Sequence, residues 1–277
     1  MNRLADWMRR RDRVLVMGVL NVTPDSFYDG GRCASPETAV ERALAMASNG
    51  ADIIDIGGES TRPGAAPIPV AEEMERVLPV IAEIRKRIEI AISIDTTKSA
   101  VAAEALAAGA SIVNDVSALR SDDAMGERVA AVDAHVVLMH MKGTPASMQE
   151  NPSYDDVVEE VRSFLEERIR AAIAVGIARD RIWIDPGIGF GKRLSHNLAL
   201  VRRLGRLAEL GLPVVAGLSR KSFLGQILDL PADDRLEGTI AANAVAIANG
   251  ADVIRVHDVA EGRRTADVAF RLRPDAV

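Results

Sequence analysis

Short apolar runs alternate along this chain with polar or glycine-rich residues. Eight such runs lie at 14–20, 52–56, 90–94, 111–113, 135–139, 182–184, 213–217 and 252–256. Short apolar runs bounded by turn-forming residues are typical of buried β-strands. Nearly every run ends on polar or glycine residues, so the pattern predicts one site built around a ring of strand ends.

Helical stretches separate most of these runs. A helix is predicted from Ser35 onward, with Ser35 as N-cap and Pro36 as the first helical residue. A second helix is predicted over 153–175. Its apolar stripe consists of Val157, Val161, Phe164, Leu165 and Ile169. Strands that alternate with helices run parallel, because each helix carries the chain back across the sheet.

A repeated junction supports a repeating βα architecture. Residues 49–54 (NGADII) return at 249–254 (NGADVI), and 108–113 (AGASIV) are a looser copy. In each copy a glycine can end a helix in the left-handed conformation just before a strand. We therefore predict one (β/α)₈ TIM barrel, a single domain over 1–277 with its core at about 14–265. The alternative is an open doubly wound sheet.

Composition narrows the class of protein. Hydrophobic residues make up 48% and charged residues 27% of the chain, which is typical of a folded domain with a large core. A net charge of −6 and a small aromatic content, with two Trp, two Tyr and five Phe, argue against a nucleic-acid surface. Anionic ligands must therefore be bound by local groups of cations.

The longest apolar stretch near the amino terminus runs from Val14 to Val22. It is too short to span a membrane and lacks a small-residue cleavage site, so we expect a cytoplasmic protein without membrane contact. The single cysteine, Cys33, cannot form an internal disulfide and is expected to be a loop thiol.

The last two strands are predicted to carry cations. Alternate side chains of a strand share a face, so Val253, Arg255 and His257 would look into the barrel together. The seventh run is followed by residues 219–222 (SRKS), and phosphate sites of TIM barrels commonly lie at the loops after strands seven and eight. These cations favour an anionic substrate group, although Arg220 and Lys221 could also form a solvated turn.

Other strand ends carry acids and an amide: Asp95 after the third run, Asn114 and Asp115 after the fourth, and Asp185 after the sixth. Such groups in one pocket suit a flat heterocycle with adjacent N–H and amino donors. Metal ligation is the alternative. However, the four histidines are scattered at 135, 140, 196 and 257, so a protein-held catalytic zinc is not expected. Asp95 alone could also be a structural carboxylate.

Three glycine-rich segments, at 29–31, 57–64 and 186–192, are expected to crown the barrel. Such loops let the backbone approach or cover a ligand. The last segment lacks the spacing of a nucleotide-binding P-loop, and no Ser or Thr follows Lys192. Lys221 could in principle form a Schiff base, but beside arginines a charge-bearing role is favoured.

Taken together, these motifs resemble those of the dihydropteroate synthase family, the sulfonamide-targeted enzymes of folate biosynthesis. The similarity spans about residues 14–265. It rests on residues 17–27 (MGVLNVTPDSF), 55–64 (DIGGESTRPG), 93–96 (SIDT), 114–116 (NDV), 139–143 (MHMKG), 185–192 (DPGIGFGK), 219–222 (SRKS) and 255–258 (RVHD). A local departure is Tyr28, where the family often has serine.

The resemblance implies a homodimeric TIM barrel that condenses 6-hydroxymethyl-7,8-dihydropterin diphosphate with 4-aminobenzoate. The products would be 7,8-dihydropteroate and diphosphate, formed by C–O cleavage ahead of attack by the arylamine, with Mg²⁺ as cofactor. Sulfonamides would compete with 4-aminobenzoate. A non-catalytic pterin-binding homologue and a pterin-dependent methyltransferase remain as alternatives.

The resemblance also implies roles for individual residues. The pterin would be held by Asp95, Asn114, Asp185 and Lys221, beside Met139 and Phe190. The diphosphate would face Asn21, Arg62, Arg255 and His257, with Asn21 also meeting Mg²⁺. The aminobenzoate would lie by Thr61, Pro63 and Ser222, with Phe27 closing over it. Asp95, Asp185, Lys221, Arg255 and His257 would form the catalytic set, with both acids ionised.

Overall fold

Eight parallel strands form the centre of the molecule. The computed structural model describes residues 3–23, 36–60, 65–144 and 147–273. The strands are β1 (Leu15–Asn21), β2 (Ile53–Gly57), β3 (Ala91–Asp95), β4 (Ile112–Asp115), β5 (His135–Met139), β6 (Ile182–Asp185), β7 (Val215–Gly217) and β8 (Val253–Val256). Each of the eight apolar runs therefore overlaps one strand, as predicted.

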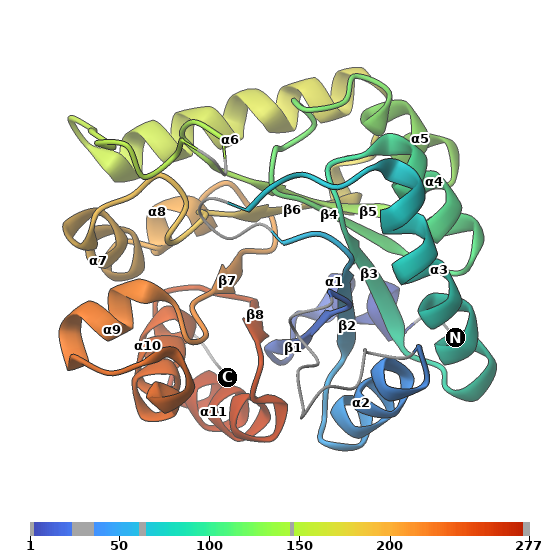
Figure 1. The fold of residues 1–277 in the computed structure, drawn as a ribbon. Coiled ribbons are helices and arrows are strands. Elements are labelled where there is room, and N and C mark those ends of the chain that lie inside the picture. Colours follow the sequence, from blue (N-terminus) through green and yellow to red (C-terminus); the bar gives the residue numbers. More distant parts are fainter. Residues whose placement is uncertain (1–2, 24–35, 61–64, 145–146, 274–277) are drawn as a thin grey trace.

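The sheet closes into a barrel. Its strand order is β6-β5-β4-β3-β2-β1-β8-β7. A parallel bridge between Ile184 and Val214, with a 2.9 Å bond from Ile184 N to Pro213 O, joins the two outer strands (Figure 1). The predicted (β/α)₈ barrel is thus confirmed and the open doubly wound sheet is excluded. β7 is the shortest of the described strands, and the N–H of Val214 just before it is bound by the carboxylate of Asp252.

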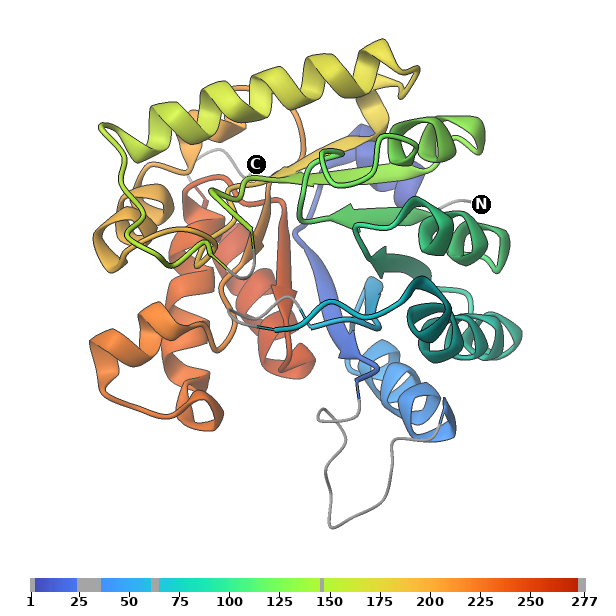
Figure 2. The ribbon, with the colours of Figure 1, turned by 45° about the horizontal axis from the view of Figure 1, so that its top comes forward.

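Helices surround the barrel (Figure 2). They are α1 (Arg3–Arg10), α2 (Pro36–Ser48), α3 (Val70–Arg87), α4 (Ser99–Ala107), α5 (Met125–Ala131), α6 (Val157–Ala174), α7 (Leu194–Arg202), α8 (Gly205–Ala208), α9 (Ser222–Leu228), α10 (Leu236–Ala248) and α11 (Val259–Arg271), with 3₁₀ turns η2 (Arg179–Arg181) and η3 (Ala232–Asp234). None of these helices is both long and apolar enough to cross a bilayer, over the residues described.

Two helix starts test the sequence prediction. α2 begins at Pro36 as expected, whereas its predicted N-cap Ser35 lies outside the described residues. α6 begins at Val157 and not at 153, because the carboxylate of Asp156 accepts the N–H groups of Val158 and Glu159. An aspartate that binds the first free N–H groups fixes the start of a helix.

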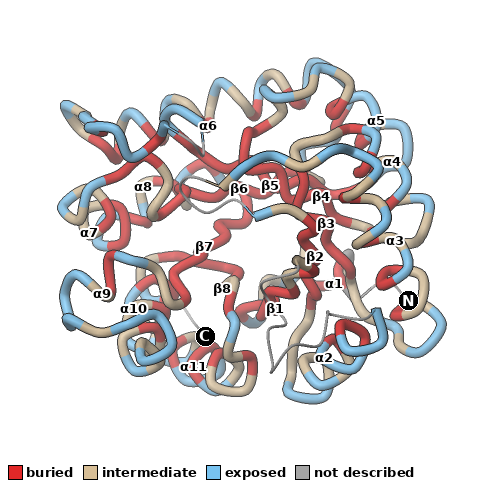
Figure 3. The backbone as a smooth tube through the Cα atoms, viewed as in Figure 1, coloured by how far each residue is buried: buried red, intermediate tan, exposed pale blue. Residues whose placement is uncertain are grey.

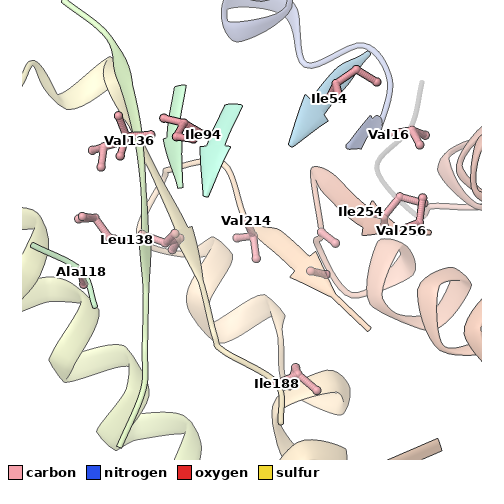
Figure 4. Packing of buried hydrophobic residues seen from close by; sticks show 14 of the residues in the cluster. Val16, Ile54, Ile94, Ala118, Val136, Leu138, Ile188, Val214, Ile254 and Val256 are labelled. Carbon is pink, nitrogen blue, oxygen red and sulfur yellow. The ribbon is translucent and has the colours of Figure 1, made fainter. Parts of the chain in front are cut away.

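Alternation along the strands separates an outer hydrophobic cluster from an inner one. The outward-facing residues pack against the helices, and Figure 4 shows Val16, Ile54 and Ile254 of three strands in this outer cluster. The strands are buried along their length while the helices expose their outer faces (Figure 3). On β8, Val253 belongs to the inner cluster and Val256 to the outer one, which confirms the predicted alternation within the strand, whereas His257 is exposed beyond the end of β8.

The inner cluster fills the amino-terminal half of the barrel. It contains Leu4 and Trp7 of α1 together with Leu15, Met17, Ile53, Ile112, Val137, Trp183, Val215 and Val253. The rings of Trp7 and Trp183 lie 5.7 Å apart, so α1 closes the barrel from below. Truncating such a buried Trp to Ala typically costs roughly 3–5 kcal/mol of stability. The floor is therefore mainly apolar, although the ring of buried His135 lies 5.6 Å from that of Trp183, and the inward-facing charged groups lie at the opposite end.

The repeated junctions work as predicted. Gly50, Gly109 and Gly250 have φ values of 96°, 113° and 110°, in the left-handed region that ends a helix. The aspartates two residues after Gly50 and Gly250 bind the backbone at the strand that precedes their own in the sequence. Asp52 Oδ2 accepts from Val16 N at 2.9 Å, and Asp252 Oδ2 accepts from Val214 N at 3.0 Å.

Candidate active site

The carboxyl-terminal layer of the barrel is polar. Near their carboxyl ends, seven strands present the inward-facing residues Asp55, Asp95, Asn114, Met139, Asp185, Gly217 and Arg255, and the inward residue before each of them is apolar except for Ser93 on β3. The register makes neighbours of Asp95 and Asn114, of Met139 and Asp185, and of Gly217 and Arg255. The structure therefore brings together Asp95, Asn114 and Asp185 as the sequence predicted. Asp115 does not join them, because its carboxylate accepts hydrogen bonds from Ser117 and Leu119 in the loop after β4.

Arg255 is bound by two carboxylates. Its Nε donates to Asp55 Oδ2 at 2.6 Å, and its Nη2 donates to Asp95 Oδ2 at 2.7 Å. The same oxygen of Asp55 accepts from Asn114 Nδ2 at 3.1 Å. Because its nitrogen is held by Asp55, the Asn114 amide has a fixed orientation. One fully buried aspartate thus orients both an arginine and an amide on this side of the pocket.

Burial perturbs both predicted acids. It raises the pKa of Asp95 to about 7, against the opposing charge of Arg255. It also raises the pKa of Asp185, which Lys221 opposes. The Oδ1 atom of Asp95 is buried and has no hydrogen-bond partner among the described residues, which marks it as an acceptor for a ligand donor. Both acids were expected to be ionised, but with this pKa Asp95 is partly protonated near neutral pH.

Lys221 and Asp185 flank a gap left by Gly217. A Cβ atom placed on Gly217 would lie 3.6 Å from Lys221 Nζ and 3.9 Å from Asp185 Oδ2. Lys221 Nζ donates to the Ile188 carbonyl and lies 4.9 Å from the centre of the Phe190 ring. Burial lowers the pKa of Lys221 to about 8. A donor and an acceptor of opposite charge therefore face the same small space.

An apolar wall stands beside these charges. Met139 and Phe190 pack together with Val116, Met141 and Met148 in a separate hydrophobic cluster. Met139 and Phe190, both assigned to the pterin pocket by the resemblance, therefore lie in one cluster. Polarisable methionines and an aromatic ring suit the face of a planar ligand.

Hydrogen bonds fix the backbone of the loop 187–191, which contains Phe190. Each of its five carbonyl groups accepts a side-chain hydrogen bond, and the donors are Lys192, Lys221, Gln149 and Tyr154. The N–H of Gly187 donates to Asp185 Oδ1 at 2.6 Å. Glycine at 187, 189 and 191 accommodates φ values of 66°, 84° and 64°, which disfavour other residues. This glycine-rich loop is a fixed wall of the pocket.

Lys192 supports that loop from within the protein. Its buried Nζ lies 2.9 Å from His140 Nδ1 and donates to the carbonyls of Gly187 at 2.9 Å and Phe190 at 3.0 Å. Burial lowers the pKa of the ammonium well below its usual value. Lys192 thus holds the loop and does not reach toward a phosphate, which confirms that the segment is no P-loop.

The remaining described candidates lie at the rim. His257 is exposed just beyond β8, and its Nδ1 lies 3.0 Å from the Oγ of buried Ser219. Asn21 ends β1 opposite Gly57, and its Oδ1 would lie 3.8 Å from a Cβ placed on that glycine. Ser222 is exposed at the first residue of α9. Phe27, Thr61, Arg62 and Pro63 lie outside the described residues, as do Cys33, Tyr28 and the segment 29–31.

Arg220 does not join the cations of the pocket, which corrects the sequence interpretation. Its guanidinium binds Asp258 through two bonds, of 2.9 Å from Nε and 2.5 Å from Nη2. Its backbone is left-handed, with φ of 57°, so the side chain points toward the loop after β8. Lys221, one residue later, points into the barrel instead.

Asp55 is the functional candidate that the sequence analysis missed. It stands in the quoted motif 55–64, yet no role was given to it. The signal was present, because Ile53, Asp55 and Gly57 share one strand face. A carboxylate two residues after an inward isoleucine had to be buried in the barrel, and a buried charge needs a partner.

Comparison with known proteins gives one consistent result. The model of the family described as "Pterin binding enzyme" matches residues 17–257. Dihydropteroate synthase of Escherichia coli (strain K12) is 49% identical over 246 residues, which are 89% of this chain and 87% of the relative.

Solved structures agree. Yersinia pestis dihydropteroate synthase in a sulfonamide drug complex superimposes with a TM-score of 0.91 at 43% identity, covering 95% of both chains. Xanthomonas albilineans dihydropteroate synthase with 4-aminobenzoic acid has a TM-score of 0.89 at 47% identity, covering 95% of this chain and 94% of that one.

Proposed function

The chain belongs to the dihydropteroate synthases, transferases of the pterin binding enzyme family, and we propose that it joins 6-hydroxymethyl-7,8-dihydropterin diphosphate to 4-aminobenzoate. The products are 7,8-dihydropteroate and diphosphate. The E. coli relative is a dihydropteroate synthase, and the Xanthomonas structure contains 4-aminobenzoic acid.

One observation supports the proposal most directly. Asp185 and Lys221 face each other across the space above Gly217, next to the wall formed by Met139 and Phe190. A pterin has N–H donors on one edge and acceptors on another, with apolar faces between. Asp185 accepts from the donor edge, Lys221 donates to the acceptor edge, and the wall covers one face.

Asp95 and Asn114 complete the pterin site from β3 and β4. The unpartnered Oδ1 of Asp95 accepts from the ligand, since its Oδ2 is bound to Arg255. Asn114 Nδ2 is bound to Asp55, so the amide turns its oxygen away from that aspartate and toward a further donor.

The reaction proceeds by departure of diphosphate before bond formation. The C–O electron pair leaves with diphosphate, and positive charge spreads from the methylene carbon into the electron-rich dihydropterin. The carboxylates of Asp95 and Asp185 stabilise that charge electrostatically. The amine of 4-aminobenzoate then forms the C–N bond and releases a proton. Arg62, Arg255 and His257 bind the departing diphosphate.

Mg²⁺ accompanies the diphosphate in this proposal. Among the described residues, no group of three or more His, Cys, Asp or Glu could hold a metal ion. The amide oxygen of Asn21 is a hard ligand at the rim, and Mg²⁺ in phosphate-transfer sites commonly takes its other ligands from phosphate oxygens and water. Asn21 therefore fits an ion that arrives with substrate, and when bound the ion neutralises the leaving group.

4-Aminobenzoate occupies the outer part of the site. Thr61, Pro63 and Ser222 contact it, and Phe27 closes over it. Sulfonamides compete for this position, and the similar Yersinia pestis enzyme forms a sulfonamide drug complex. Of these residues only Ser222 is described, at the rim one residue after Lys221.

The active form is a cytoplasmic homodimer. An apolar groove runs between α10 and α11, lined by Ile240, Ala244, Val268 and Leu272. The exposed fractions of Val268 and Leu272 are 61% and 75%. A second copy that covered this groove would remove these side chains from water, which is favourable by about 25 cal/mol per Å² of apolar surface.

The test measures diphosphate release and dihydropteroate formation in parallel. Purified protein is given the pterin diphosphate, Mg²⁺ and 4-aminobenzoate, with Lys221→Ala as the control. Matched formation of both products, lost in the variant, establishes the synthase. Pterin binding without product contradicts the proposed reaction and points to a non-catalytic homologue.

A further inference from the structure

The ends of β7 and β8 are tied together above the barrel. Ser219 Oγ accepts from His257 N at 3.2 Å and lies 3.0 Å from His257 Nδ1. One residue further along each strand, Arg220 binds Asp258 through both carboxylate oxygens. The exposed fractions of these two side chains are only 34% and 18%. A partly buried two-bond pair of this kind fixes geometry better than an exposed ion pair does.

The backbone of Arg220 is also held. Its left-handed φ of 57° is unfavourable for a residue with a Cβ and persists only where contacts maintain it. The N–H donates to Thr239 Oγ1 at 3.0 Å, and the carbonyl accepts from Arg235 Nη1 at 3.0 Å. Both Thr239 and Arg235 belong to the start of α10, so that helix holds the turn from the side away from β8.

Arg235 fixes α9 as well. Its Nε and Nη2 donate to the Leu230 carbonyl beyond the end of α9, at 2.9 Å and 2.8 Å. Its guanidinium lies flat on Gly225 inside that helix, where a Cβ would come within 2.4 Å of Arg235 Cζ. Arg235 therefore binds both the turn before α9 and the segment after it.

We propose that Arg220 and Arg235 are positioning residues of the synthase, which act without touching substrate by fixing Lys221 and Ser222 relative to Arg255 and His257. The inference rests on the proposed function for the roles of these four residues. The Arg220–Asp258 pair sets the separation of the two strand ends, and Arg235 sets the direction of α9. Lys221 and Ser222 lie in the chain between Arg220 and the part of α9 that Arg235 binds. If the Arg220–Asp258 pair is lost, both residues, and the contacts they make with substrate, are displaced together.

The main experiment is a double-mutant cycle on the pair. Arg220→Met keeps the aliphatic stem and removes the charge. Asp258→Ala removes the acceptor, and the Asp258 side chain makes no capping hydrogen bond to α11 that would also be lost. Each single variant is expected to lower kcat/KM by about tenfold, through a higher KM for both substrates, because displaced contact groups weaken binding. The double variant is expected to lose no more than either single one.

Arg203→Met is the matched control. Arg203 makes a two-bond pair with Asp156, with lengths of 3.1 Å and 3.0 Å, on the outer surface beside α6. Its loss removes an ion pair in which both side chains are 45% exposed and which does not touch the turn at 219–222, so both KM values should stay unchanged. Arg220→Lys, which retains one charged contact to Asp258, should recover part of the lost kcat/KM.

A second readout does not depend on turnover. Lys221 is modified with an amine-reactive ester, and the rate at that residue is followed by peptide mass spectrometry in folded wild type and variants. Release of the turn exposes the buried ammonium, so Arg220→Met should react several-fold faster. Unchanged KM values together with an unchanged Lys221 rate overturn the inference, as do multiplicative losses in the double variant. If the wild-type protein forms no dihydropteroate, the proposed function is wrong. The rate of Lys221 modification then tests the positioning role by itself.

Discussion

Arg255 Nη2 lies 2.7 Å from Asp95 Oδ2, so the guanidinium of β8 and the carboxylate of β3 meet across the barrel. Asp55 of β2 shares the same guanidinium. Together with Asp185 and Lys221, the pocket gathers three carboxylates and two cations. This surplus of negative charge suits a dihydropterin that becomes cationic as its leaving group departs.

The buried Asp55 should affect activity although it lies behind the groups assigned to substrate. Asp55→Asn keeps the shape but removes the charge that holds Arg255 and Asn114. We expect kcat/KM for the pterin diphosphate to fall by about tenfold or more, and the free energy of unfolding to fall by about 1–3 kcal/mol. Steady-state kinetics and urea unfolding measure the two effects.

A matched control for that variant lies at the other end of the barrel. Asp52 accepts from Val16 N and binds Arg13 and Arg263. Asp52→Asn should lower the free energy of unfolding without changing KM. If both variants changed only stability, the positioning role of Asp55 would be wrong.

The pH dependence of kcat/KM should show two limbs. With a pKa of about 7, Asp95 loses its carboxylate form as the pH falls below 7, and the rate constant should decrease with it. With a pKa of about 8, Lys221 loses its charge as the pH rises above 8, which weakens its hydrogen bond to the pterin. The maximum is therefore expected between about pH 7 and 8, since kcat/KM reports the free enzyme. Lys221→Met should lack the alkaline limb, and a wild-type profile flat from pH 6 to 9 would contradict both assignments.

Gly217→Ala should separate binding from stability. The atom nearest to the added Cβ would be Lys221 Nζ at 3.6 Å, an ordinary van der Waals contact, so the fold accepts the methyl group. The unfolded chain loses conformational freedom, which raises the free energy of unfolding by about 0.5 kcal/mol. The methyl group fills the space between Lys221 and Asp185, so KM for the pterin diphosphate should rise by about tenfold. Gly205→Ala, whose Cβ would meet only Asn249 O at 3.7 Å, is the control that should leave KM unchanged.

Asp185→Asn should weaken pterin diphosphate binding severely. The Asn oxygen can keep the bond from Gly187 N, and the amide nitrogen then faces the pocket as a donor. A donor opposite the N–H groups of the pterin loses a charged hydrogen bond, which corresponds to about 10–100-fold in Kd. Isothermal titration calorimetry measures the constant, and an unchanged value would refute the role of Asp185.

The proposed dimer can be tested on its apolar groove. Val268→Lys places a charge on a side chain that is 61% exposed in one chain and buried if a second copy covers it. We expect monomers by light scattering after size exclusion, with the fold retained by circular dichroism. Arg271→Lys at the end of the same helix conserves charge and should leave the molecular mass unchanged. A wild-type protein that is monomeric at micromolar concentration would exclude the dimer.

Sequence alone could predict the barrel because its signal is repetitive. The inward and outward residues of β8 follow directly from alternation, and the glycines at 50, 109 and 250 end helices in the predicted conformation. The convergence of Asp95, Asn114 and Asp185 follows from parallel strands that end at one edge. None of this requires knowledge of side-chain contacts.

The partners of the charged groups could not be predicted in the same way. Arg255 meets Asp55 across β1, and this contact depends on the register of three strands that lie far apart in the chain. The direction of Arg220 depends on one left-handed φ, which the run of cations at 219–222 does not encode. Lys192 shows the same limit, because a lysine after glycines can turn outward to a ligand or inward to carbonyls.

The loop at 187–191, whose five carbonyl groups all accept hydrogen bonds, affects how ligands are distinguished. Its backbone has already lost its conformational freedom on folding, so a ligand beside Phe190 does not have to order it. Ring systems of similar shape contact the same rigid surface around Phe190 and gain similar contact energy from it. Discrimination among flat heterocycles is therefore decided at their edges, by the match of donors and acceptors to Asp185 and Lys221, and rigid bicyclic inhibitors should be ranked by edge chemistry more than by size.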